Sequence, residues 1–180
     1  CRRLTNIEIP ESVTSIGYSA FENCSNLINI KILESVTSIG YSAFENCSSL
    51  INIKIPVRVE KIEVSTFRNC SNLKIIEIPE SVINIGYSAF AGCYNLKTIT
   101  FSENSKLESI SAYMFNGCEN LYSITFENGN MQLIIDKDTS PKDNIPYSGG
   151  EFRTKDFYGY GKYEVCMKPA KNDGIVSSFF

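Results

Sequence analysis

Residues 24–46 read CSNLINIKILESVTSIGYSAFEN, and this pattern of 23 residues recurs along most of the chain. Its clearest marker is a cysteine at a fixed interval of 23 residues, with a last interval of 25. The cysteines of this series are Cys1, Cys24, Cys47, Cys70, Cys93 and Cys118. A fixed period of roughly 20–29 residues is typical of solenoids, in which each repeat forms one coil and contacts its neighbours.

Each repeat contains a short alternating segment that predicts a β-strand. In residues 24–46 this segment is Ile30, Lys31 and Ile32, whose two isoleucines point to the same face of a strand. In three repeats a proline follows, and proline cannot donate a hydrogen bond to a strand ladder, so we expect the strand to end there. These prolines are Pro10, Pro56 and Pro79.

A second apolar set completes each coil, and in residues 24–46 it consists of Val36, Ile39 and Phe44. A glycine such as Gly40 interrupts this set, and we expect it to end a second short segment. One such coil cannot bury its apolar side alone, whereas coils stacked ~4.8 Å apart can. The sequence therefore predicts a mainly β fold, a solenoid of about five and a half coils over residues 1–127. We expect it to be roughly 25 Å long, with inward ladders of like residues.

The cysteine column has two interpretations. Each cysteine is a small apolar side chain in a buried corner of its coil, or neighbouring coils are joined by disulfides. Parallel stacking favours the first, because like side chains point in the same direction. Asparagines also recur around the cysteines, as at Asn23, Asn46 and Asn69, and we expect them to satisfy backbone groups of turns.

The composition excludes several classes of function. The net charge of −3 gives no reason to expect nucleic acid as a partner, and no apolar run is long enough to span a membrane. Histidine is absent and no C-x-x-C occurs, so we expect no metal site and no histidine-activated nucleophile. Because Cys1 lies inside a repeat, we expect both ends to be internal to a longer protein.

The repeat L-x-x-I-x-I-P-x-x-V-x-x-I-G-x-x-A-F-x-x-C resembles the bacterial surface-antigen type of leucine-rich repeat. The resemblance covers residues 1 to about 126, with a drift at Glu63, where glycine is usual, and two extra residues near 104–106. It implies an extracellular or cell-surface location and adhesion to a partner, either a protein or a surface polymer. The ligand is not identified by the resemblance.

The outward positions of the predicted strands are the candidate partner-binding face; the alternative is a solvated surface without a partner. The candidate residues are Asn6, Glu8, Asn29, Lys31, Asn52, Lys54, Ile75, Glu77, Thr98 and Thr100. Stacking places Glu8 beside Lys31 and Lys54 beside Glu77, which predicts two lateral charge pairs, each worth roughly a few tenths of a kcal/mol.

Residues 128–180 lack the repeat and form a second predicted unit. The alternating segments predict short strands at 131–135, 151–157, 162–167 and 175–180, with a loop at 136–150. The stretch GGEFRTKDFYGYGKYEVCMKPAKNDGIVSSFF, residues 149–180, resembles the first part of lichenases, the endo-β-1,3-1,4-glucanases of glycoside hydrolase family 16. The resemblance implies an incomplete β-jelly-roll fragment in which Glu151, Arg153 and Phe180 match substrate-binding positions.

This lichenase-like segment departs from its family in one decisive respect. The family's catalytic carboxylates come from an E-I-D-I-E strand, and no E-x-D-x-E occurs in this sequence. We therefore expect no hydrolysis by the chain as it stands, no catalytic residue, and no cofactor; the family's calcium and β-glucan belong to a complete parent jelly roll. Three hypotheses remain: an interaction module with a non-catalytic tail, an inner part of a modular β-glucanase targeted by its repeats, or an artificial join of two sequences.

Overall fold

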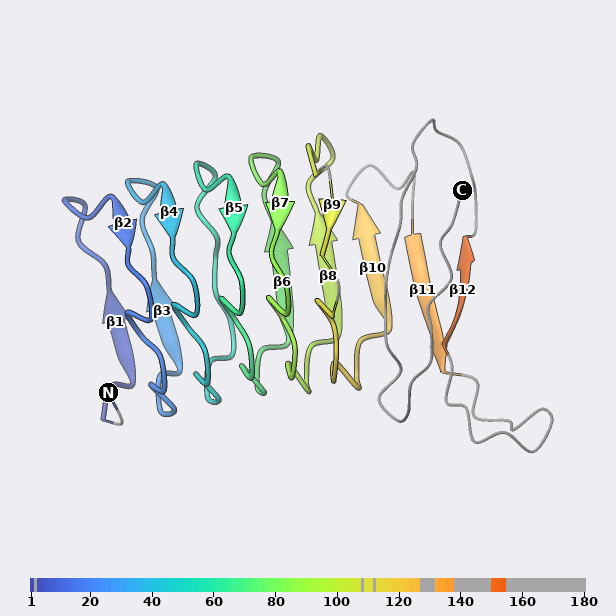
Figure 1. Cartoon of the computed structure of the whole chain (residues 1–180), viewed down its shortest axis with the longest axis horizontal. Helices are drawn as coiled ribbons and strands as arrows, with labels where there is room; N and C mark the ends of the chain where they lie inside the picture. The colour runs from blue at the N-terminus through green and yellow to red at the C-terminus, as the bar shows by residue number, and fades with distance from the viewer. Residues whose placement is uncertain (2, 108, 112, 127–131, 138–149, 155–180) are drawn as a thin grey trace.

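The computed structural model describes residues 1, 3–107, 109–111, 113–126, 132–137 and 150–154, which form a stack of β-coils (Figure 1). Strands and turns make up these ranges, and no helix occurs within them. The predicted mainly β solenoid is confirmed.

Two columns of parallel strands run along the solenoid. The first contains β1 (Asn6–Glu8), β3 (Asn29–Lys31), β6 (Ile75–Ile78), β8 (Thr98–Phe101) and β10 (Ser123–Phe126). The second contains β2 (Ser15–Ile16), β4 (Ser38–Ile39), β5 (Lys61–Ile62), β7 (Asn84–Ile85) and β9 (Ser109–Ile110). Equivalent residues face each other, so that Ile7 lies opposite Ile30 and Ile76 opposite Ile99. The third coil is fully described, and its pairing in the first column is a single isolated bridge, between Asn52 and Asn29.

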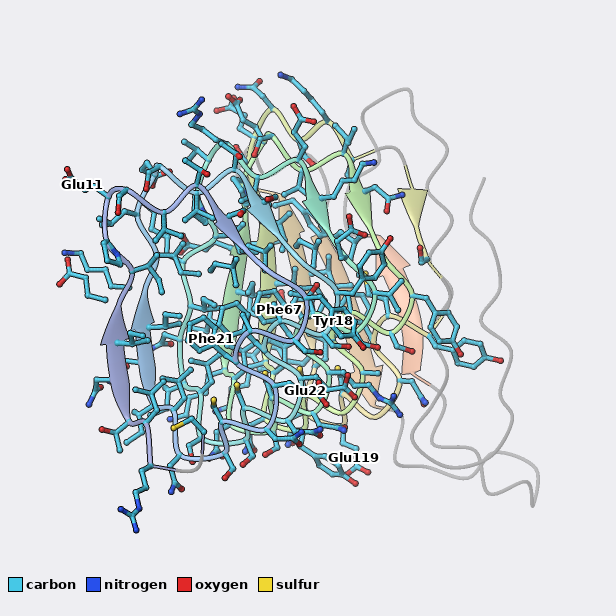
Figure 2. The ribbon with its side chains drawn as sticks, turned by 60° about the vertical axis from the view of Figure 1, so that its left-hand side comes forward. Glu11, Tyr18, Phe21, Glu22, Phe67 and Glu119 are labelled. Atoms are coloured by element: carbon cyan, nitrogen blue, oxygen red, sulfur yellow. The ribbon has the colours of Figure 1, made fainter. Side chains whose placement is uncertain are left out.

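The core is a set of ladders of identical residues, as the repeat predicts. Leu27, Leu50, Leu73 and Leu96 are fully buried and occupy the same place in successive coils. The phenylalanine rings form a continuous stack, with centroids 5.3 Å apart for Phe21 and Phe44. Figure 2 shows Phe21 and Phe67 inside the stack, whereas Glu11 and Glu119 lie at its periphery. Burial of these ladders between neighbouring coils is the main stabilising interaction.

The six cysteines of the series are free thiols, and the four in the middle of the series are buried. Cys24, Cys47, Cys70 and Cys93 are buried free thiols. From Cys47 onward, each thiol of the series donates a hydrogen bond to the phenylalanine carbonyl of the previous coil, as in the 3.1 Å contact from Cys47 Sγ to the oxygen of Phe21. Burial raises the pKa of the Cys47 and Cys118 thiols to about 12. These thiols therefore stay protonated, and they act as packing groups that also satisfy a carbonyl.

The glycine that follows a strand of the second column, as at Gly86, has a role other than the predicted one of ending the strand. β5 ends at Ile62 although Glu63 follows it, so glycine is not required to end the strand. A Cβ atom at Gly86 would lie 2.6 Å from the backbone nitrogen of Val64 in the previous coil. Glycine at position 86 thus permits the close approach of two backbones.

The sheet of the solenoid continues into the lichenase-like segment. β11 (Gln132–Lys137) pairs antiparallel with β10, and β12 (Gly150–Thr154) pairs antiparallel with β11. The first two predicted strands of residues 128–180 are thus present, with somewhat different bounds, and the predicted loop is shortened at both ends by strand residues. The strands predicted at 162–167 and 175–180 lie outside the described residues, as does most of the predicted jelly-roll fragment.

Candidate binding surfaces

The outward side chains of the first strand column form a flat surface, hereafter the strand face. Its members predicted from the sequence lie in β1, β3, β6 and β8, except for Asn52 and Lys54 of the third coil, where Asn52 forms an isolated bridge with Asn29. Their exposure falls along the solenoid: Ile75 is 51% exposed, whereas Thr98 and Thr100 are half-buried and Ser123 is 7% exposed. The accessible part of the strand face therefore belongs to the first four coils.

One of the two predicted charge pairs on the strand face is confirmed and the other is wrong. Lys31 Nζ lies 2.6 Å from Glu8 Oε1, as predicted. Lys54 Nζ instead lies 2.8 Å from Glu34 Oε1, and Glu77 contributes a smaller through-space attraction that raises the pKa of Lys54 less than Glu34 does. Lys54 is drawn to the turn because the other oxygen of Glu34 already accepts the backbone N–H of Val57, at 2.8 Å.

Glu34 marks a shallow hollow of about 330 Å³ at the edge of the strand face, lined by Ile30, Lys31, Ile32, Leu33, Glu34 and Lys54. Hydrogen bonds from Lys54 and from the Val57 backbone lower the pKa of Glu34. The hollow thus offers two ammonium groups and one firmly ionised carboxylate around apolar side chains, an arrangement suited to a mixed polar and apolar partner.

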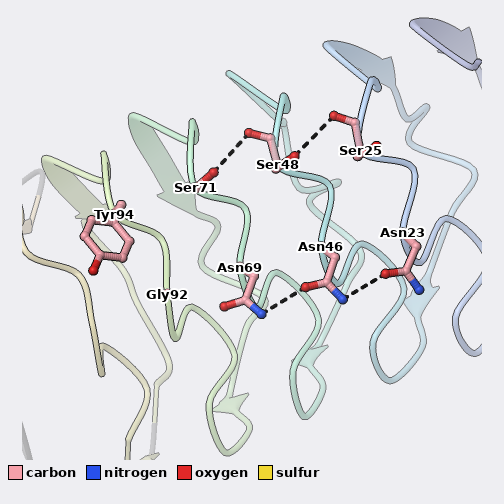
Figure 3. A pocket seen from close by; sticks show the side chains of 8 residues that line it. All are labelled: Asn23, Ser25, Asn46, Ser48, Asn69, Ser71, Gly92 and Tyr94. Carbon is pink, nitrogen blue, oxygen red and sulfur yellow. Dashed lines mark hydrogen bonds between the residues drawn. The ribbon is translucent and has the colours of Figure 1, made fainter. Parts of the chain in front are cut away.

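A second hollow, hereafter the polar groove, runs along four coils at the corner marked by the cysteines (Figure 3). Its volume is about 510 Å³, and its lining residues are Asn23, Ser25, Asn46, Ser48, Asn69, Ser71, Gly92 and Tyr94. The position before each cysteine forms one wall, and the position after each cysteine forms the other. The sequence did not predict this groove, because neither wall differs in composition from an ordinary turn.

The first wall of the polar groove is a ladder of amides. Asn46 Nδ2 donates to Asn23 Oδ1 at 3.0 Å, and Asn69 Nδ2 donates to Asn46 Oδ1 at 2.9 Å. The predicted structural role for these asparagines is correct, but their side chains bond to one another across coils. All three have a positive φ of about 60°, where asparagine is better tolerated than most residues.

Glycine replaces asparagine in the ladder position of the next two coils, at Gly92 and Gly117. Both keep a positive φ, 74° and 77°, so the backbone conformation of the turn is preserved. Any Cβ atom at Gly92 would collide with Oδ1 of Asn69. The amide ladder therefore ends at Asn69, with its last oxygen directed toward a position that has no side chain.

The second wall carries hydroxyl groups and ends at an aromatic ring. Ser48 and Ser71 each donate a hydrogen bond of 3.3 Å to the backbone oxygen of the serine one coil earlier. Tyr94 occupies the next position, and a hydrogen bond to the Glu119 carboxylate raises the pKa of its phenol. Its backbone oxygen accepts Asn120 Nδ2 at 2.8 Å. Tyr94 is thus half-exposed, and both its phenol group and its backbone oxygen have hydrogen-bond partners.

A column of exposed tyrosines is a further surface feature that sequence reasoning missed. Tyr18, Tyr41 and Tyr87 follow the strand of the second column in the first, second and fourth coils, with Val64 at the equivalent position of the third coil. Tyr113 of the fifth coil stands one position later, where the other coils have a serine, and it shares the positive φ of those serines. Tyr87 and Tyr113 make an edge-to-face contact with centroids 5.4 Å apart. The signal was present in the repeated G-Y-S-A-F, but an aromatic residue in an apolar repeat is readily taken as part of the core.

The predicted glucan-binding residues are partly placed. Glu151 and Arg153 both lie in β12, opposite Asp136 and Ile134 of β11. Phe180 lies outside the described residues. Two of the three positions thus lie in one strand, and their role in binding glucan stays a prediction.

No cluster of three or more cysteine or acidic side chains suited to a metal ion occurs in the described residues. Likewise, no helix in this part of the chain has the length and apolarity needed to cross a membrane.

Comparison with known families divides the chain into two overlapping parts. Residues 1–122 match the BspA type leucine rich repeat region, in six copies. Residues 111–180 match the glycosyl hydrolases family 16. The two matches overlap in the last coil, where the solenoid sheet continues toward β11.

Individual relatives show the same division. The chain is 47% identical over 79 residues to a β-glucanase of Acetivibrio thermocellus, a match that covers 44% of this chain and 23% of the relative. The fold of this chain is similar to that of a leucine rich cell surface protein from Faecalibacterium prausnitzii A2-165, with a TM-score of 0.65 and 35% identity. The match covers 68% of this chain and 32% of that protein. A leucine-rich repeat protein from Bacteroides ovatus gives a TM-score of 0.57 and 30% identity. This match covers 70% of this chain and 31% of that protein. The chain thus spans less than a third of the length of each of these proteins.

Proposed function

The chain belongs to the BspA type leucine rich repeat family, and we propose that it is a secreted or cell-surface binding module whose strand face contacts a protein or a surface polymer. The similarity to a leucine rich cell surface protein supports the location. The lichenase-like segment is proposed to be non-catalytic in this chain, because the E-x-D-x-E sequence is absent.

The observation that carries the proposal is the row of exposed polar and charged side chains on the strand face. Asn6, Asn29 and Asn52 are exposed and in register, and Asn29 Nδ2 donates to Asn6 Oδ1 at 3.0 Å. Backbone hydrogen bonds between coils fix the spacing of these groups, so little conformational entropy is lost when a partner binds. A rigid and regularly spaced polar surface of this kind suits recognition of a large partner rather than of a small metabolite.

Two basic residues provide the test of the strand face. We expect the chain to bind at least one member of a panel of immobilised extracellular proteins and cell-wall polymers, measured by biolayer interferometry. The double variant Lys31→Ala/Lys54→Ala should weaken that binding by roughly fivefold or more, because both ammonium groups are exposed at the centre of the face.

The matched control is Arg58→Ala/Lys61→Ala, which removes two exposed positive charges from the turn and strand that follow in the third coil. Its binding should equal that of the unmodified chain. Equal losses in both double variants would indicate a nonspecific charge effect, and a panel without any binder would refute the proposed function.

A second candidate function is supported by the glucanase match. The chain would be an inner part of a modular β-glucanase in which the repeats bring the catalytic domain to its substrate or to a surface. The specific observation in its favour is the continuity of the sheet. β11 and β12 extend the solenoid sheet, and only residues 127–131 separate β10 from β11. A direct junction of this kind would hold the repeats close to the glucan-binding segment.

The two candidates differ in what is expected of a longer protein. The chain of 180 residues should release no reducing sugar from mixed-linkage β-glucan, because it lacks the paired carboxylates of a retaining glycosidase. A reducing-sugar assay measures this directly, and release above a heat-inactivated control would show that the chain is itself an enzyme. A longer form with an E-x-D-x-E strand and hydrolytic activity would support the second candidate.

A further inference from the structure

We propose that the polar groove is a binding site for a linear β-glucan chain. The inference deepens the proposed function, because the choice of β-glucan rests on the family 16 part of the chain. The site is separate from the strand face and from Glu151 and Arg153 of β12, and it lies at the cysteine corner of the coils (Figure 3).

The amide wall has unused hydrogen-bonding capacity. A carboxamide carries two N–H donors and an oxygen with two lone pairs. In the ladder, Asn46 uses one donor toward Asn23 and one lone pair toward Asn69, which leaves a donor and an acceptor on the same group. Paired donors and acceptors on rigid planar groups match the vicinal hydroxyls of a sugar, each of which both donates and accepts. Because the ladder already fixes the amide orientation, binding costs little rotamer entropy.

The hydroxyl wall faces these amides across the groove. Ser48 and Ser71 direct their protons to backbone oxygens, so their hydroxyl oxygens retain lone pairs that can accept hydrogen bonds. All eight lining residues are uncharged. A neutral groove with both donors and acceptors favours a neutral polyhydroxyl polymer over a phosphorylated, acidic or basic one.

Tyr94 supplies the apolar contact that a pyranose ring needs. Its ring stands at the end of the groove beside Gly92, where the absence of a side chain leaves space next to the aromatic face (Figure 3). The hydrogen bond to Glu119 holds the phenol oxygen and therefore limits where the ring can lie. A ring held in this position can stack on the C–H face of a sugar with a reduced ordering cost.

The shape of the groove favours a linear chain. Its polar groups repeat once per coil, so their spacing is that of stacked strands, ~4.8 Å. An extended β-linked glucan presents its pyranose units at a comparable step, so successive sugars would meet successive coils. Adjacent to this repeat, the same polypeptide carries the β-glucanase-like segment. A groove that holds the same polymer would keep the substrate near that segment by raising its effective concentration.

Affinity electrophoresis of the full chain tests the inference, with gels that contain soluble mixed-linkage β-glucan. The unmodified chain should be retarded. Tyr94→Ser, which installs the serine of the earlier coils, should raise the dissociation constant roughly two- to tenfold. Asn46→Gly should raise it about threefold. Glycine accepts the positive φ of position 46, so this variant should fold even if Tyr94→Ser does not.

The matched control is Tyr41→Ser, which removes a half-exposed tyrosine outside the groove and should leave retardation unchanged. An absence of retardation of the unmodified chain would overturn the inference, as would equal retardation by dextran, an α-linked glucan. Retardation that survives Tyr94→Ser and Asn46→Gly, or is lost in Tyr41→Ser, would place the glucan site elsewhere and overturn the groove. Each of these results leaves the strand-face proposal standing, since that proposal depends on Lys31 and Lys54.

Discussion

Replacement of Phe67 by alanine is expected to cost about 3–5 kcal/mol of the free energy of unfolding. The Phe67 side chain is fully buried, and its ring centroid lies 5.5 Å from that of Phe44 and 5.4 Å from that of Phe90. Removal of the ring leaves a cavity and breaks the stack at its centre, so two interfaces between coils are weakened together. Thermal unfolding followed by circular dichroism should show a fall in Tm of roughly 6–20 °C.

Phe21→Ala is the matched control, because the same side chain is deleted from the same column in the first coil. Phe21 is only partly buried and stacks on Phe44 alone among the rings of the described residues. Its loss should therefore cost no more than about 2 kcal/mol. Equal costs for the two variants would contradict the view that the phenylalanine stack stabilises the solenoid through coil-to-coil contacts.

Alkaline pH is expected to unfold the solenoid well before it would unfold a typical domain. Burial raises the pKa of Cys47 and Cys118 to about 12, and it raises the pKa of Cys70 and Cys93 well above the ordinary value. The folded state therefore keeps thiol protons that the unfolded state releases above about pH 8.5. Each thiol lowers the free energy of unfolding by about 1.4 kcal/mol per pH unit above that point, so four thiols together lower it by roughly 5.6 kcal/mol per pH unit.

Denaturant unfolding at a series of pH values measures this effect. Below about pH 8 the thiols should add no pH dependence to the free energy of unfolding. Between about pH 9 and 11 the free energy of unfolding should fall steeply. The slope of the free energy of unfolding against pH is proportional to the number of protons released on unfolding. The variant Cys70→Ala should release one proton fewer and therefore show a shallower slope, even though its stability at neutral pH is lower. A free energy of unfolding that is independent of pH up to about 10.5 would show that the thiols are not buried as described.

Much of this fold could be predicted from the sequence because a repeat reports each structural position several times. The inward ladders at Ile30, Val36 and Phe44 follow from period and polarity alone. The strand pairing of like residues then follows from stacking. The hydrogen bonds from the cysteine thiols to the phenylalanine carbonyls could not be predicted from the sequence, because they depend on the distance between neighbouring backbones.

The candidate surfaces were less predictable, since an exposed side chain is not constrained by the repeat. The sequence predicted that Lys54 pairs with Glu77, yet Lys54 bonds to Glu34, because a long flexible side chain can reach an acceptor outside its own strand column. The polar groove escaped prediction for a different reason. It is formed by two positions on either side of Cys24 and its counterparts, and only a turn with positive φ brings their side chains to opposite walls.

Identical ladders have a consequence for folding. Residues 11–25 and 34–48 have the same sequence, so the third coil can pair with the first almost as well as with the second. A pairing that skips one coil would leave 23 residues looped out in a kinetically trapped state. The irregular positions remove this degeneracy. Glu63 in place of glycine, Gly92 in place of asparagine, and the longer fifth coil each distinguish one coil from the others, so departures from the repeat favour the correct order of assembly.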